Sequence, residues 1–141
     1  METGDVRRRL QQPIERARRG AAGRRTRNDE ATRAFDDFLD RVAVPLFKQV
    51  ANVLKIEHYP FTVFTPSGSV RLMSDKSADD FIELALDTSD REPRVMAHIS
   101  RSRGRRVVDE EQVVGTGAPE ALTEEDLLTF LLTALEPFVE R

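Results

Sequence analysis

No catalytic motif is evident in this sequence, and the two residues best placed for chemistry are Glu83 and His98. They lie in two runs, FIELALD and RVMAHIS, that alternate apolar and polar residues as half-buried strands do. If residue 84 pairs with residue 97, Glu83 lies beside His98 on the outer face of a hairpin. A Glu–His dyad can serve as a general base, but no nucleophile is placed to use it. We interpret His98 as a half-exposed residue of a sheet.

Two short motifs raise the question of a metal or a phosphate ligand. Residues 109–111 are three consecutive carboxylates, which alternate across a strand or lie in a loop, and no second acidic cluster completes a coordination sphere. Residues 115–117, Gly-Thr-Gly, precede a helix, but no Lys-Ser/Thr pair follows, and the loop continues through Pro119. The chain also has no cysteine to supply a thiolate. We predict no metal, no cofactor and no catalytic residue, and a protein that is not an enzyme.

Arginine is concentrated in two places. Residues 1–28 hold nine arginines against three acidic residues, so this segment carries +6 and the remainder of the chain carries −9, for a net charge of −3. Four more arginines crowd a predicted hairpin tip at 101–106. Either feature is a solvated surface or a contact for an anionic partner such as a nucleic-acid phosphate backbone. The candidate contacts are Arg7, Arg8, Arg9, Arg18, Arg19, Arg24, Arg25, Arg101, Arg103, Arg105 and Arg106.

The longest periodic segment, residues 28–57, predicts a helix that begins at Asn28 or Asp29, either of which can cap it. Pro45 removes one helical hydrogen bond and disfavours a helical residue before it, which predicts a kink or short break at residues 42–45. A core stripe is expected at Ala31, Phe35, Phe38, Leu39, Val42, Leu46, Val50, Val53 and Ile56.

Alternation and turn residues predict strands at about 61–65, 69–74 and 105–114, in addition to the central hairpin. Residues 123–126, Thr-Glu-Glu-Asp, resemble a capping box and predict a helix over 124–139. The expected fold is a two-layer α+β domain. It has a long, Pro-kinked N-terminal helix, a four- to five-stranded antiparallel meander and a C-terminal helix, with both helices on one sheet face. We expect residues 1–28 to form a flexible arm and residues 29–141 to form the single domain.

Both helices carry more apolar surface than one sheet face requires. We therefore favour a non-catalytic interaction or adaptor module, either a homodimer or a protein with another protein partner. The candidate interface residues are Phe47, Leu54, Leu128, Leu132 and Val139. The alternative is a nucleic-acid-associated protein. A less favoured class, a small-ligand carrier or an enzyme, would use His58, Tyr59 and His98.

The sequence also bears on location. It has no run of about 18 apolar residues that would span a bilayer. It also has no apolar segment behind its N-terminal charges to form a signal peptide. We expect a cytoplasmic protein, and the lack of cysteine fits a reducing compartment.

Overall fold

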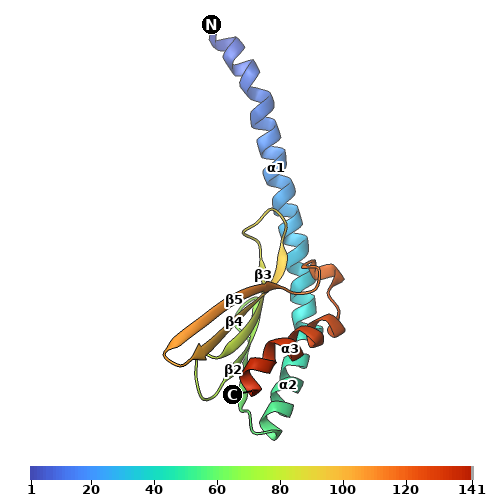
Figure 1. The fold of residues 1–141 in the computed structure, drawn as a ribbon. Coiled ribbons are helices and arrows are strands. Elements are labelled where there is room, and N and C mark those ends of the chain that lie inside the picture. Colours follow the sequence, from blue (N-terminus) through green and yellow to red (C-terminus); the bar gives the residue numbers. More distant parts are fainter. Residues whose placement is uncertain (141) are drawn as a thin grey trace.

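The structure, a computed structural model, describes residues 1–140. A helical column of three segments leads into one antiparallel sheet, and a last helix packs beside the column (Figure 1). The helical segments are α1 (Thr3–Phe38), the π-helical turn η1 (Leu39–Ala43), α2 (Val44–Ile56), the 3-10 turn η2 (Pro119–Ala121) and α3 (Glu124–Val139). The strands are β1 (Phe61–Phe64), β2 (Ser69–Ser74), β3 (Phe81–Asp87), β4 (Arg94–Arg103) and β5 (Arg106–Val113).

The N-terminal segment is helical from Thr3, so the prediction that the helix begins at Asn28 or Asp29 is wrong. Arg, Ala, Gln and Glu, which dominate this segment, are strong helix formers. The helix is also nucleated by the part that packs on the body, so each further residue adds one hydrogen bond without a new nucleation cost. Ala31 is the first buried side chain of α1. The arm, residues 1–28, therefore projects from the body by about 40 Å at 1.5 Å per residue (Figure 1).

The break predicted at residues 42–45 is present as the π turn just before Pro45. The amide of Val44 donates to the carbonyl of Leu39, five residues back, which is the π-helical pattern. Pro45 has no amide proton, so the helix resumes with Pro45 in its first turn, where a missing donor costs least.

The π turn changes which face of α2 is buried. It inserts in effect one extra residue, so the residues that follow it are rotated about the helix axis by about one position, or 100°. Phe47 and Ala51 are buried, whereas Val53 and Ile56 are 60% and 74% exposed. The expected stripe is thus correct up to Leu46 and wrong at Val53 and Ile56, because it assumed an uninterrupted α-helix.

The sheet is a five-stranded meander in the order β1-β2-β3-β4-β5. The register predicted for the central hairpin is confirmed, with Leu84 opposite Ala97 and Asp87 opposite Arg94. One face of the sheet is apolar and carries both α2 and α3, so the two-layer α+β architecture is confirmed (Figure 1). Fully buried residues on this face are Val70, Leu72, Ile82, Leu84, Val95 and Ala97.

Helix α3 begins with the predicted capping box. The Asp126 amide donates to Thr123 Oγ1 at 3.1 Å, and the Thr123 amide donates to Asp126 Oδ2 at 3.2 Å. Leu127 and Leu131 then enter the core without exposed surface, and Phe138 meets Phe61 edge-on at 5.9 Å between ring centroids. Among residues 1–140, no helix is both long and apolar enough to cross a membrane.

Candidate interaction surfaces

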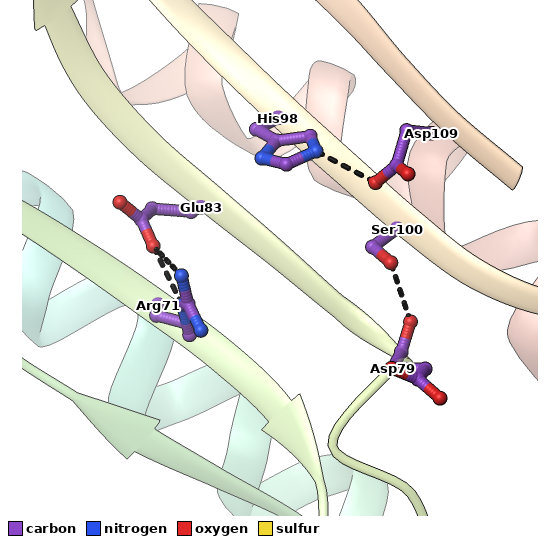
Figure 2. A network of polar contacts seen from close by, with 6 residues as sticks. All are labelled: Arg71, Asp79, Glu83, His98, Ser100 and Asp109. Atoms are coloured by element: carbon purple, nitrogen blue, oxygen red, sulfur yellow. Dashed lines mark hydrogen bonds and ion pairs between the residues drawn. The ribbon is translucent and has the colours of Figure 1, made fainter. Parts of the chain in front are cut away.

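The outer face of the sheet carries a polar network on β2 to β5 (Figure 2). Arg71 Nε donates to Glu83 Oε2 at 2.6 Å, and its guanidinium lies 4.1 Å from the centroid of the Phe81 ring. His98 Nε2 lies 2.8 Å from Asp109 Oδ1. Glu83 is indeed opposite His98 in the register, but its side chain turns to Arg71, whose Nε and Nη2 both approach Glu83 Oε2. The predicted Glu83–His98 contact is therefore replaced by two separate pairs.

These residues include a serine, a histidine and an aspartate, yet they are not arranged as a nucleophile and its base. Ser100 Oγ donates to the carbonyl of Asp79 at 2.6 Å, and Figure 2 shows this hydroxyl directed away from His98. Ser100 is also 2% exposed, so its hydroxyl is closed to solvent. A hollow of about 380 Å³ lies beside His98 on this face. The network ties neighbouring strands together.

His58 and Tyr59, the two other residues proposed for chemistry, terminate helix α2. His58 adopts a positive φ of 71°. Its amide donates to the carbonyl of Lys55, and the Tyr59 amide donates to the carbonyl of Leu54. These two bonds form a Schellman motif, which normally has glycine at the position of His58. Tyr59 Oη donates to the carbonyl of Val139 at 3.1 Å and so joins the ends of α2 and α3. Both residues have a structural role here.

The acidic motif at residues 109–111 divides between the two faces of β5. Asp109 bonds His98 on the outer face, whereas Glu110 pairs with Ile99, which is buried on the helix-covered face. Within residues 1–140, no group of three or more His, Cys, Asp or Glu side chains is arranged to hold a metal ion.

The five residues proposed as a protein interface fall into three groups. Phe47 is fully buried in the core of the chain, so we correct its assignment: the π turn directs it inward. Leu54, Leu128 and Val139 are half-buried, and Leu54 and Leu128 pack against the core. Leu132 is 60% exposed. Sequence reasoning missed the exposed Val53 and Ile56 at the end of α2, because only knowledge of the π turn reveals their direction.

The arm presents an apolar stripe with arginines on both sides. Val6, Leu10 and Ile14 are 41%, 51% and 44% exposed and lie on one side of α1. At 100° per residue, one set of arginines lies about 60–80° from Leu10 and a second set lies about 100–120° away on the other side. The first set is Arg7, Arg18 and Arg25, and the second is Arg9, Arg16 and Arg27.

The arm and the arginine-rich tip at 101–106 lie at opposite ends of the body. The C-terminal end of β5 leads to η2, which packs on α1. The other end of β5 starts at the tip, and at 3.3 Å per residue the two ends of this strand are about 26 Å apart. The tip lies beside Pro137 and Glu140 of α3. Figure 1 shows the same separation, with the arm and the β4–β5 turn pointing apart. These two basic features do not form one surface within a single chain.

A further surface, which we call the α3–β5 cleft, lies where the helices stop covering the sheet. Every residue of β5 is exposed, so the helix-facing side of this edge strand is open. A cleft of about 330 Å³ separates it from α3. The floor is apolar, and the rim carries three glutamates and one arginine, Arg101. The floor includes Ile99, Val108 and Phe138, and the rim includes Glu110, Glu136 and Glu140. Residues 109–112 of β5 are polar on both faces, so the sequence indicates an uncovered strand but not the cleft itself.

Comparisons with models of protein families, with curated proteins and with solved structures find no match.

Proposed function

We propose that this protein is a non-catalytic interaction module that self-associates, with the basic arm of one copy bound to the acidic body of another. The observation that carries the proposal is the arm itself. It is a helix of charge +6 that stands clear of a body of charge −9 and exposes Val6, Leu10 and Ile14 along one line. Exposed apolar stripes on a helix mark binding surfaces. The cytoplasmic location expected from the sequence is part of the same proposal.

Electrostatics favours contact between the arm of one copy and the body of another over contact between two arms. Two arms laid side by side bring together two segments of +6 each, and like charges facing across an interface cost several kcal/mol. An arm laid on the acidic body places opposite charges together and also covers its apolar stripe. Association should therefore weaken as salt rises, because exposed ion pairs are screened.

The test measures the mass of the full-length protein by light scattering over a range of concentration. We expect a dimer or larger assembly, and a shift to monomer when Leu10→Asp and Ile14→Asp are combined. The matched control combines Gln12→Asp and Thr26→Asp, which changes the charge equally but lies about 160–200° from Leu10 around the helix. An unassociated wild-type chain at micromolar concentration would refute self-association. Equal effects of the two double variants would refute the role of the stripe.

A second candidate function is contact with a nucleic-acid phosphate backbone through the arm. It is supported by arginines on several sides of an exposed helix, while the absence of aromatic residues from this segment argues against base stacking. A gel-shift titration across salt tests it. The expected signature is affinity that falls steeply with salt, and binding that does not change with salt would remove the idea.

A further inference from the structure

We propose that β5 of one copy pairs antiparallel with β5 of a second copy, about a two-fold axis at Val108. The five-stranded sheets of the two copies then form one continuous sheet, with the helices of both copies on the same face. The contact uses the edge of the sheet and not the arm, so it goes beyond the proposed function. It commits to one occupant, a second copy of this chain.

The sheet edge formed by β5 is long and open. β5 is the last strand of the sheet, and within residues 1–140 it pairs only with β4 (Figure 1). All eight of its residues are exposed, whereas β1 at the opposite edge has four residues. An open edge is a template for another strand, and proteins restrict such pairing by keeping edges short or by placing charges on them. Because β5 is not short, its charges determine what it can pair with.

The backbone pattern of β5 determines which of its residues can bond a further strand. The Val114 amide donates to the carbonyl of Val95 at 3.0 Å, and β4 and β5 keep one register from there to the tip. Because hydrogen-bonded and non-hydrogen-bonded pairs alternate along an antiparallel ladder, the even-numbered residues of β5 direct their backbone groups to β4. The odd-numbered residues direct theirs to the open edge, and they are Val107, Asp109, Glu111 and Val113. A second β5 must therefore place odd-numbered residues opposite odd-numbered residues, which leaves few registers.

Side-chain charge selects one of these registers. A two-fold axis at any of residues 109–111 sets a carboxylate opposite its own copy, and like charges directly opposite destabilise a sheet. An axis at Val108 sets Arg106 opposite Glu110 twice, once on each side, and no like charges meet. Axes at the remaining positions of β5 align no opposite charges within the strand. The charges on this edge thus disfavour the other registers and favour the one at Val108.

The side chains that meet in this register are available for the contact. Arg106 and Glu110 are exposed, and neither takes part in an ion pair within residues 1–140. Arginine and glutamate can share two hydrogen bonds when they pair. Val108 is 38% exposed on the helix-facing side of β5 and meets its own copy at the axis, which removes apolar surface from water. Charge and apolar contact therefore support the same register.

The contact is small, so it depends on concentration. Val107 pairs with Asp109 of the second copy on each side of the axis, which gives about four ladder hydrogen bonds. Residues 106–110 of each copy are far fewer than the roughly 20–30 residues a side of a standard interface. Edge pairing alone therefore requires a protein concentration well above micromolar. The chain with Leu10→Asp and Ile14→Asp is thus a monomer at micromolar concentration and pairs through β5 in the submillimolar range.

The absence of native cysteine allows a direct test of this pairing. Val108→Cys is introduced into the full-length chain with Leu10→Asp and Ile14→Asp, so that the arm contact cannot produce the result. The protein is oxidised at submillimolar concentration, and the rate of disulfide-linked dimer formation is measured. At the axis the two cysteines form a non-hydrogen-bonded pair with about 4.5 Å between Cα atoms, which is within the range for a disulfide.

The matched control is Gln112→Cys in the same chain. Residue 112 is exposed on the same face of the same strand, but its two copies lie about 26 Å apart in this register. We expect the Val108→Cys dimer to form at least about tenfold faster than the Gln112→Cys dimer, because only the paired cysteines have a raised effective concentration. Equal rates would overturn the pairing.

Reversal of charge tests the register itself. Arg106→Glu and Glu110→Arg each set like charges opposite one another, and each should slow formation of the Val108→Cys dimer by about fivefold or more. The two together restore opposite charges and should restore the rate. A general effect of net charge would instead move the two single variants in opposite directions, and a double variant as slow as the singles would overturn the register.

The outcome is separable from that of the proposed function. If the wild-type chain is a monomer at micromolar concentration but Val108→Cys reacts faster than Gln112→Cys, the arm-mediated assembly is overturned and the edge contact stands. If the wild-type chain self-associates through the arm but the two cysteines react equally, the edge contact is overturned and the proposed function stands.

Discussion

The sharpest prediction concerns which side of α2 stabilises the fold. Phe47→Ala should lower the free energy of unfolding by about 3–5 kcal/mol, whereas Ile56→Ala should change it by no more than about 0.5 kcal/mol. Phe47 has no exposed surface and Ile56 is 74% exposed. An aromatic side chain buries roughly 150–250 Å², which at about 25 cal/mol per Å² amounts to about 4–6 kcal/mol. Alanine retains part of this burial and leaves a cavity, which gives the stated range.

The assay is urea unfolding followed by circular dichroism, since the chain has no tryptophan. A loss of this size is a large part of the 5–15 kcal/mol typical of a domain, so the midpoint should fall clearly with an unchanged slope. Each variant is measured at two protein concentrations, because association adds an apparent stability that depends on concentration. A loss for Ile56→Ala that equals or exceeds that for Phe47→Ala would refute the rotation of the apolar face by the π turn.

Three further predictions address local features. His58→Gly should raise the free energy of unfolding by about 1 kcal/mol in urea unfolding, because glycine adopts the positive φ without strain; a loss would mean that the imidazole makes a needed contact. Thr123→Ala should cost about 1 kcal/mol through loss of the capping box, and Thr123→Ser should restore most of it. Hydrogen bonds from the Ser89 side chain and amide lower the pKa of Asp87 below 3.8. The stabilisation from Asp87 is therefore complete above about pH 4 and is lost as pH falls through the folded-state pKa. Urea unfolding of Asp87→Asn should accordingly give a lower stability than wild type at pH 7 and an equal stability below that pKa.

The sheet was predictable from the sequence because its signals are local and mutually consistent. The alternation in residues 81–87 and 94–100 allows one register that sets Ile82 opposite Ile99 and Leu84 opposite Ala97 on the buried face, and a slip by one residue in either strand would turn its apolar set to the other face. The same holds for the start of α3, where Thr123 and Asp126 have the right types at the right spacing.

The long helix was less predictable because its phase depends on a backbone detail. A proline indicates that a bond is lost, but it does not specify whether the chain kinks, breaks or widens into a π turn. The choice of a π turn moved Phe47 inward and left Ile56 outside. The extension of α1 to Thr3 was missed for another reason: Gly20 and Gly23 interrupt the helical pattern, and residues 3–28 bury no side chain that would stabilise the helix.

The candidate surfaces likewise include some that the sequence predicts and one that it does not. The arginines and the apolar stripe of the arm were visible in the sequence, since both follow from residue type and helical spacing. The α3–β5 cleft was not, because it depends on how far α3 extends across the sheet. Only the three-dimensional arrangement brings Glu110 of β5 and Glu136 of α3 to one rim.

The isolated position of the arm has a thermodynamic consequence. Residues 3–28 bury no side chain on the body, so the helical fraction of this segment depends mainly on intrinsic propensity. Gly20 and Gly23 each make the helix less stable by about 1 kcal/mol relative to alanine. Any partner that binds the helical form must also supply the free energy of ordering the arm. A methyl group at Gly20 meets only the end of the Arg24 side chain, at 3.5 Å. Affinity for the partner is thereby linked to residues that never touch it, and alanine at either glycine would tighten binding through pre-organisation alone.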